Sequence, residues 1–431
     1  MTGRTVLSGA RHPGDVAFDD GHIVAVGTIA AEPGDAVIDC TDTVITAGLV
    51  NTHHHLYQWI TRGRAIGCDL FGWLTELYPV WGRIEVDDVR AAALVGLSEL
   101  AHTGCTTASD HHYLVPHGDD SVFDAIAEAA GQVGIRLHLS RGSMDLSEKD
   151  GGLPPDHVVE PLEAILRSTE RVIAQHHDGE WVSVVVAPCS PFSVSGELMV
   201  ESAALARRHG LRLHTHLGET IEEEHHCLER FGRRPTDVLD EWGWIAPDVW
   251  VAHGIHLSDS EVDRMGQQRC GVAHCPSSNA RLGSGSCRVV DLVAAGAPVG
   301  LGVDGAASNE VGGLFPELRQ ALYTARQRAG DASCFGPADA LERATAGGAA
   351  CLGRRDIGRL QVGARADLAV WATSDMTDVA DPLAGLVLGP DRRVRDLYVG
   401  GRLVVEQGVH RSVDTSAARQ DLARRAKRLW A

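Results

Sequence analysis

Short apolar segments alternate with amphipathic helical segments through most of this chain, and the alternation limits the folds open to it. The predicted strands span residues 44–50, 105–109, 135–140, 182–188, 211–216, 249–253, 271–275 and 298–304. Helical periodicity separates them, as at 87–102, 121–133 and 159–176. Strand–helix alternation over about 300 residues favours a (β/α)8 TIM barrel. A doubly wound open sheet is the structural alternative.

Both ends of the chain contain short β-like segments instead of this alternation. They lie at 16–18, 22–26, 36–39 and 43–45, and again at 366–371, 394–399 and 402–405. Neither set is large enough for a confident separate domain. We therefore predict one small β-sandwich domain built from residues 1–48 and 363–431, around a barrel at 49–362. The chain ends in an amphipathic helix, predicted to pack on the body through Leu422, Leu429 and Trp430.

The net charge of the chain limits the kinds of partner that it can bind. A formal charge of −19 argues against binding nucleic acid, because phosphate neutralisation requires a basic surface. The first residues lack the apolar core of a signal peptide, and no long apolar run follows. We therefore expect no membrane contact and a cytoplasmic location. The 10 cysteines are scattered singly, which indicates buried apolar residues rather than a disulfide framework.

Histidine is the unusual residue type, with 22 copies. His53 and His55 follow the first predicted strand, two residues apart. On an extended backbone both side chains point to the same side, and His54 points to the other. Two imidazoles at this spacing can converge on one metal ion. Taken alone, an HxH pair is more often structural, so the hypothesis depends on the strands that follow.

Later strands end in the same kind of side chain. His216 and Glu219 follow the fifth predicted strand, His253 the sixth and Asp304 the eighth. Neutral imidazoles with one carboxylate suit Zn²⁺ or Fe²⁺. A glutamate just beyond a metal-ligating histidine suits proton transfer. Because a barrel gathers the carboxyl ends of its strands on one face, the pattern predicts one catalytic metal site there.

The ordered set of motifs resembles the amidohydrolase superfamily over essentially the whole chain. The HxH at 53–55, the HxxE at 216–219, the HCPSSN at 274–279, GLVNTH and GARADLAVW carry the resemblance. It implies that the metal ligands are His53, His55, His216 and Asp304. It also implies that Glu219 transfers protons, that His253 orients the nucleophile and that Asp304 accepts the proton of water.

One departure from the binuclear members of that superfamily is informative. Those members carry a bridging lysine at the end of the fourth strand, whereas this strand reads WVSVVVAPCSPFS. Cys189 stands nearby and is interpreted as structural. The chain is therefore most similar to the mononuclear deaminase and chlorohydrolase branch. This resemblance implies one Zn²⁺, with Fe²⁺ as the alternative, and a homo-oligomer.

Within that branch, HHHLYQWITRG and GCTTASDHHYLVP are most similar to 8-oxoguanine deaminases. The resemblance implies hydrolysis of an aminated purine, 8-oxoguanine, to urate and ammonia. The amide of Gln58 can donate and accept hydrogen bonds, which suits an oxopurine edge. We predict Trp81 as part of a stacking wall, and one of His111 and His112 as a further substrate contact.

Alternatives stay open at this point. For both enzymatic functions, the substrate is a small aromatic heterocycle. Guanine, isoguanine or an aminated or chlorinated s-triazine would use the same metal core as 8-oxoguanine. A metal-binding barrel without turnover is the alternative of a different class. The presence of Glu219, His253 and Asp304 together argues against it, because a non-catalytic barrel needs no acid–base groups.

Overall fold

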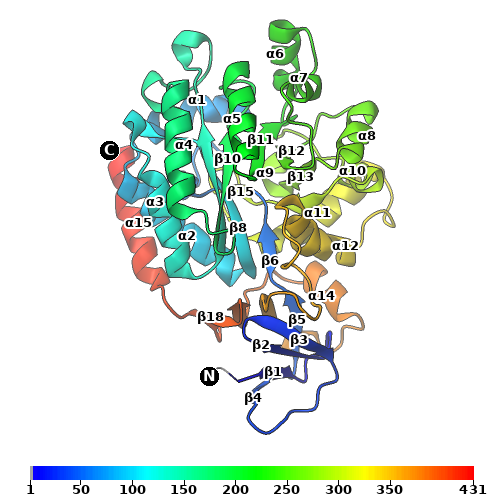
Figure 1. The fold of residues 1–431 in the computed structure, drawn as a ribbon. Coiled ribbons are helices and arrows are strands. Elements are labelled where there is room, and N and C mark those ends of the chain that lie inside the picture. Colours follow the sequence, from blue (N-terminus) through cyan, green and yellow to red (C-terminus); the bar gives the residue numbers. More distant parts are fainter. Residues whose placement is uncertain (1–2) are drawn as a thin grey trace.

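The computed structural model describes residues 3–431, and a parallel barrel is its main unit (Figure 1). The barrel strands, in sheet order, are β6 (Leu49–Asn51), β8 (Cys105–His112), β9 (Arg136–Ser143), β10 (Val182–Pro188), β11 (Arg212–Leu217), β12 (Val249–His253), β13 (Gly271–His274) and β14 (Val299–Leu301). β14 returns to the end of β6, because the N–H of Thr52 donates to the carbonyl oxygen of Leu301 at 2.9 Å. The predicted barrel is confirmed.

Helices cover the outside of the barrel, so its strands are buried on both faces. Every residue of β8 and β9 is buried. Leu137 and Leu139 of β9 belong to the apolar core shared with the helices. Ser140, the next residue along the strand, points to the opposite face and places its hydroxyl 3.2 Å from the hydroxyl of Ser109 on β8. This alternation puts a row of polar side chains inside the barrel.

The helices are α1 (Leu70–Trp81), α2 (Val86–His102), α3 (Val122–Val133), α4 (Leu162–His176), α5 (Gly196–Arg208), α6 (Ile221–Phe231), α7 (Pro235–Glu241), α8 (Asp259–Gln267), α9 (Pro276–Arg281), α10 (Val289–Ala295), α11 (Leu314–Ala329), α12 (Pro337–Glu342), α13 (Gly348–Cys351), α14 (Pro382–Leu388) and α15 (Thr415–Trp430). Shorter helical turns are η1 (Leu56–Thr61), η2 (Pro116–Gly118), η3 (Glu148–Asp150), η4 (Asp156–Val158), η5 (Arg343–Gly347) and η6 (Ser374–Met376). The predicted helices at 87–102, 121–133 and 159–176 correspond to α2, α3 and α4. The terminal helix α15 packs against α2 with Leu422 and Leu429 buried, as predicted.

Two further sheets form the small domain at the other end of the molecule from α6 and α7 (Figure 1). One runs β3 (His22–Gly27), β2 (Asp15–Asp19), β1 (Thr5–Ser8), β4 (Ala36–Asp39); the other runs β19 (Val409–His410), β18 (Arg402–Glu406), β17 (Asp396–Val399), β16 (Leu368–Ala372), β5 (Thr43–Ala47). Val16 and Ile23 of the first sheet share a core with Ile45, Leu368 and Val370 of the second. This confirms a β-sandwich built from both termini. The domain boundaries at 48/49 and 362/363 stay predictions.

The interpretation of residues 44–50 as one barrel strand is wrong. Residues Thr43–Ala47 form β5, which pairs antiparallel with β16 in the small domain, and only Leu49–Asn51 enter the barrel as β6. Gly48 separates the two. A Cβ at Gly48 would lie 2.2 Å from the side chain of Thr106. The chain therefore passes between the two domains at a point where only glycine fits.

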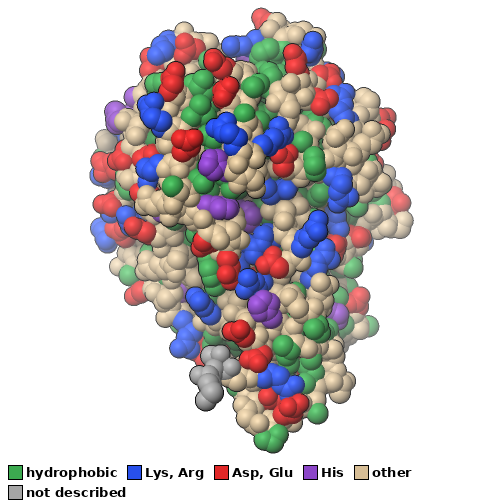
Figure 2. Space-filling view, in the orientation of Figure 1, with side chains coloured by type: hydrophobic (Ala, Val, Ile, Leu, Met, Phe, Trp, Pro, Cys, Tyr) green, Lys and Arg blue, Asp and Glu red, His purple; other side chains and the backbone are tan. Residues whose placement is uncertain are grey.

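The surface carries charges of both signs. Figure 2 shows Lys and Arg side chains interspersed with Asp and Glu over the face in view. Within residues 3–431, no helix is both long and apolar enough to cross a membrane.

Candidate active site

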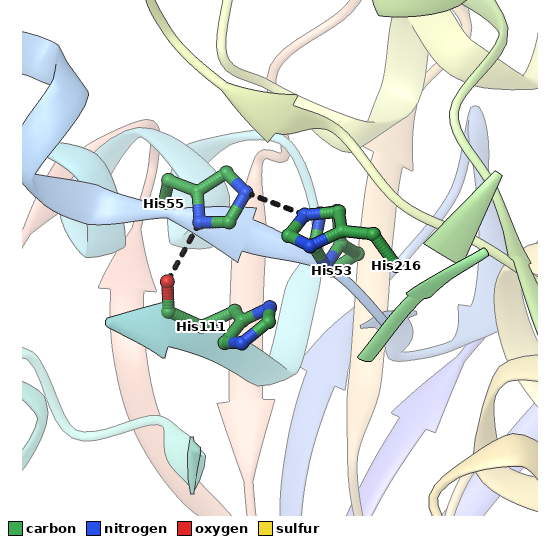
Figure 3. Close-up of side chains that lie close together, drawn as sticks. All are labelled: His53, His55, His111 and His216. Carbon is green, nitrogen blue, oxygen red and sulfur yellow. Dashed lines mark hydrogen bonds between the residues drawn. The ribbon is translucent and has the colours of Figure 1, made fainter. Parts of the chain in front are cut away.

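The carboxyl ends of the barrel strands bring the predicted histidines together, as Figure 3 shows for His53, His55, His111 and His216. A short parallel pairing extends the first strand. In it, β7 (His54–His55) lies beside β15 (Asp304–Gly305), and the N–H of Asp304 donates to the carbonyl oxygen of His53 at 3.0 Å. Asp304 is thereby placed against the HxH segment.

His55 and His216 face each other through their Nε2 atoms, which lie 3.2 Å apart. The Nδ1 atom of His55 lies 2.6 Å from the carbonyl oxygen of His111, and Nδ1 of His216 lies 2.7 Å from that of Cys189. A carbonyl oxygen can only accept, so each Nδ1 carries the proton. Burial lowers the pKa of both imidazoles, to about 3 for His216. Both rings are therefore neutral, and two Nε2 lone pairs converge.

His53 adds a third such nitrogen. Its Nδ1 lies 2.8 Å from Nε2 of His214, whose own Nδ1 donates to the carbonyl oxygen of Trp250 at 2.8 Å. His214 therefore accepts from His53, which leaves Nε2 of His53 unprotonated. That buried Nε2 has no hydrogen-bond partner among the described residues. It lies 3.4 Å from Oδ1 of Asp304, and Nε2 of His55 lies 3.3 Å from the same oxygen.

These donors fit a divalent cation. Three unprotonated imidazole nitrogens and one carboxylate oxygen match the ligand types that Zn²⁺ prefers. Without a cation, three lone pairs and a negative charge would be buried close together at a cost in free energy. The other oxygen of Asp304, Oδ2, accepts from the hydroxyl of Ser278 at 2.6 Å.

Glu219 and His253 form the acid–base part of the site. Oε2 of Glu219 lies 3.6 Å from Nε2 of His253, and Nδ1 of His253 donates to the side-chain oxygen of Asn279 at 2.9 Å. Burial raises the pKa of Glu219 to about 7. Burial would lower the pKa of His253, but the carboxylates of Glu219 and Asp304 raise it. A glutamate with a pKa near neutrality can both donate and accept a proton there.

A cavity opens above this cluster and is bounded by His55, His216, Glu219, His253 and Asp304 at its polar end. It holds about 660 Å³ of unfilled space, part of it open to solvent. The rest of its lining is largely apolar and aromatic: Leu70, Trp73, Leu74, Tyr78, Tyr113, Leu153, Pro154, Phe192 and Leu282, with Gln58, Cys189, Ser190, Ser193, Glu223 and Ser308. A lining that is mostly apolar and aromatic, with polar groups at one end, suits an aromatic heterocycle that carries a few polar groups.

The predicted substrate residues do not all reach this cavity. Gln58 lines it, and its buried Oε1 is without a hydrogen-bond partner within the part of the chain described. Trp81 packs against Trp73 and Tyr78, behind the lining, and its indole N–H donates to Thr61. The Trp81 ring therefore packs against other side chains of α1 and η1 and does not line the cavity.

His111 and His112 also lie behind the lining. The Nε2 of His111 donates to the carbonyl oxygen of Ala187 at 2.8 Å, and its ring stacks on that of His216. The Nε2 of His112 donates to the carbonyl oxygen of Leu114 at 2.7 Å, and its ring meets Phe123. The two side chains alternate across β8, so that His111 faces the histidine cluster and His112 the helices.

Comparison with known proteins identifies the family. Residues 44–404, which include both halves of the site, match the amidohydrolase family. The chain belongs to the amidohydrolase family. It is 47% identical to the 8-oxoguanine deaminase of Pseudomonas aeruginosa over 94% of this chain and 92% of that protein. It is 37% identical to an isoxanthopterin deaminase from an unknown prokaryotic organism, covering 94% and 90% of the two chains.

Solved structures give the same fold. An atrazine chlorohydrolase from Arthrobacter aurescens TC1, complexed with zinc, superposes with a TM-score of 0.92 at 29% identity. The match covers 98% of this amidohydrolase and 100% of that chain. Relatives in this family thus include both deaminases and a chlorohydrolase.

Sequence reasoning missed several residues of this amidohydrolase site. Ser278 and Asn279 lie within the HCPSSN segment that carried the resemblance, yet their contacts with Asp304 and His253 emerge only from the structure. Tyr78 lines the cavity, but it lies on α1, a helix that was not predicted from the sequence. Glu223 sits in an acidic run, IEEE, that is typical of a solvated helix start. Its burial is a property of the fold, and no sequence signal distinguished it from Glu222.

Proposed function

We propose that this amidohydrolase is a hydrolytic deaminase of an aminated purine, with 8-oxoguanine as substrate and urate and ammonia as products. The observation that carries the proposal is the convergence of three unprotonated imidazole nitrogens and Asp304 beside the Glu219–His253 pair. This set lies on the floor of a cavity with aromatic walls. The similarity to an 8-oxoguanine deaminase along nearly the whole chain supports the substrate.

The proposed cofactor is one divalent cation, Zn²⁺ or alternatively Fe²⁺, held by His53, His55, His216 and Asp304. Such a cation would lower the pKa of a water molecule toward neutrality, so that hydroxide is available at physiological pH. The zinc in the related chlorohydrolase structure supports this metal. Tautomers fixed by backbone carbonyls keep His55 and His216 ready to bind it.

Side chains of the protein then transfer the protons of the reaction. The Asp304 carboxylate accepts one proton from the attacking water, while His253 orients that water by a hydrogen bond. Glu219 donates a proton to the ring nitrogen beside the carbon that carries the amino group, which prevents negative charge from building up there. The water oxygen bonds to that carbon and gives a tetrahedral intermediate.

Collapse of the intermediate completes the reaction. The proton held by Asp304 passes to the amino group, the C–N bond breaks, and ammonia leaves. The remaining hydroxyl proton returns to Glu219 as the ring carbonyl forms. Both carboxyl groups are thereby restored for the next cycle, and the reaction consumes one water for each ammonia released.

Gln58 is the proposed recognition residue for the oxopurine edge. Gln58 is buried, and its side chain occupies the space where a Cβ of Gly305, the residue after Asp304, would stand. An amide here can pair with a carbonyl and an N–H on one ring edge. Cytoplasmic location, a homo-oligomeric state and the absence of nucleic-acid or membrane partners stay predictions from the sequence.

Two other functions compete with this proposal. Guanine, isoguanine or an s-triazine would use the same metal and acid–base groups, and the chlorohydrolase relative supports a C–Cl bond as a substrate group. A metal-binding barrel without turnover is the third possibility. A buried Glu219 next to His253 argues against it, because burying an acid–base pair without using it costs free energy.

The test is ammonia release by zinc-loaded protein against 8-oxoguanine, guanine, isoguanine, cytosine and melamine, with chloride release from a chlorinated s-triazine measured alongside. Glu219→Gln serves as the control. Turnover of 8-oxoguanine that is lost in the control would support the proposal. Turnover of another ring alone would transfer the mechanism to that substrate. If the fully metallated protein turns over none of these substrates, the non-catalytic barrel is favoured.

A further inference from the structure

A second buried carboxylate lies beside Glu219 and has no part in the mechanism above. Glu223 is 1% exposed, lines the same cavity and belongs to the first turn of α6. Its neighbours differ from it: Glu222 is exposed, and the half-buried Glu224 pairs with Arg234. A buried carboxylate is costly unless its oxygens are hydrogen-bonded, so its partners indicate what it does.

Both oxygens of Glu223 accept backbone hydrogen bonds from the segment that carries Glu219. Oε1 accepts from the N–H of Gly218 at 2.9 Å, and Oε2 accepts from the N–H of Glu219 itself at 3.2 Å. Gly218 has φ of +62°, a left-handed conformation that glycine adopts readily. Glu223 therefore clamps the turn at which the chain leaves β11 and places Glu219 in the cavity.

The other side of the same turn is attached to the segment that follows His253. The carbonyl oxygen of Gly218 accepts from the N–H groups of Ile255 and His256, each at 2.9 Å. The N–H of Gly254 donates to Leu217 at 3.0 Å. The turn thus lies between Glu223 and the loop after β12. Its backbone position determines how the Glu219 carboxyl meets the His253 ring.

We propose that Glu223 is a positioning residue, which holds the Gly218–Glu219 turn so that the Glu219 carboxyl faces His253 and the substrate. The proposal rests on the function proposed above only in that Glu219 is the proton-transfer group. Burial raises the pKa of Glu223 to about 7. When Glu223 is ionised, its hydrogen bonds to the backbone N–H groups are charge-assisted and stronger than neutral ones. They are suited to hold an acid–base group within the narrow geometric tolerance that catalysis requires.

The first experiment compares Glu223→Gln with Glu222→Gln in the zinc-loaded protein. The amide of Gln offers one acceptor oxygen in place of two, so one backbone N–H loses its partner. We expect kcat to fall about 10- to 100-fold, the effect of a displacement of about 1 Å, with KM and bound zinc unchanged. Glu222→Gln removes a charge from the same helical turn and should leave kcat unchanged. A raised KM with unchanged kcat would overturn the proposal, because Glu223 would then contact substrate.

A double variant separates positioning from an independent role. In the Glu219→Gln background the positioned group is already lost, so adding Glu223→Gln should reduce the residual rate no further. A second loss of the full 10- to 100-fold would overturn the proposal. Should Glu223→Gln fail to fold, Glu223→Asp, whose shorter side chain loses reach to the turn, replaces it in both experiments.

Backbone amide exchange provides a readout that does not depend on turnover. In Glu223→Gln the amides of Gly218 and Glu219 should exchange faster than in the wild-type protein, while those of β12 keep their protection. Glu222→Gln should show wild-type exchange. Unchanged exchange in Glu223→Gln would overturn the proposal even if activity falls. If wild-type protein turns over none of the substrates, the proposed function fails, and exchange still decides the role of Glu223.

Discussion

The imidazole of His53 donates its Nδ1 proton to Nε2 of His214 across 2.8 Å, and His214 in turn donates to the carbonyl oxygen of Trp250. A chain of two neutral rings therefore fixes the tautomer of a proposed metal ligand. Outer partners of this kind orient the ligand and raise its basicity. His214 would thus support the proposed metal site through His53.

Replacing His214 with leucine should weaken metal binding. Without the acceptor, the Nδ1 proton of His53 is left buried without a partner, and a roughly 10- to 100-fold loss of zinc affinity is expected. Competition with a chelator of known affinity measures it. His138→Gln, a substitution of another buried strand histidine, is the comparison variant. Equal zinc affinity in wild type and His214→Leu would contradict the assignment.

Replacing Glu219 with glutamine should remove proton transfer and leave the metal in place. We expect kcat to fall by about 10²- to 10⁴-fold, with bound zinc unchanged by elemental analysis. The expectation follows from the position of Glu219 beside His253 at the polar end of the cavity. Retention of more than a tenth of the wild-type rate would assign proton transfer to another group.

Replacing Gln58 with leucine should impair substrate recognition. An oxopurine edge would lose its partners at about 1–3 kcal/mol, so kcat/KM for 8-oxoguanine should fall roughly 5- to 150-fold. Steady-state kinetics on zinc-loaded protein measures the change. Trp81→Phe tests the stacking role predicted for Trp81 from the sequence. Since Trp81 packs behind Trp73 and Tyr78, its kinetic parameters should be close to wild type; a comparable fall there would restore the stacking role.

Stability should depend on pH through His138. Burial, followed by the charges of Arg354 and Arg212, lowers the pKa of His138 to about 3. Between that value and about 6.5, the unfolded chain binds a proton that the folded chain does not. Each such proton lowers the unfolding free energy by about 1.4 kcal/mol for every pH unit of acidification.

The measurement is the unfolding temperature of wild type and His138→Gln at several pH values from 7.5 to 5. Stability of both proteins should fall with pH, because other buried histidines titrate too. The slope should be smaller in His138→Gln by the contribution of one proton. Parallel slopes would mean that His138 is protonated in the folded protein.

The barrel followed from the sequence because it depends on local pattern, and so did the gathering of histidines at the ends of its strands. The assignment of metal ligands came from the family resemblance and stays a prediction. Apolar runs and the residues that end them repeat with the period of the fold. The first strand shows where this reasoning stops. Residues 44–50 form one apolar run, and nothing local reveals that Gly48 divides it between two sheets. The side chain of Thr106, on β8, occupies the space beside Gly48 and leaves room only for glycine there.

The substrate side of the site was harder to predict for a related reason. The spacing of His53 and His55 fixes which way they point, but it does not say what lies in front of Trp81. Trp73 and Tyr78 of the same helix, α1, pack against that ring. Gly72 and Pro79 within α1 obscure this helix in the sequence. Glu223 is the opposite case. An acidic residue at a helix start suggests exposure, and only tertiary contacts turn its side chain back onto the Gly218–Glu219 turn.

The pairing of β5 with β16 sets an order for events during protein synthesis. The indole N–H of Trp371 on β16 donates to Thr46 on β5, although the two residues are 325 positions apart. At the usual rates of translation, β5 waits about 15 to 65 seconds for its partner strand to be made. The entire barrel emerges during that interval. The small domain, whose first strands precede the barrel in the sequence, therefore cannot be completed until all the barrel strands have been made.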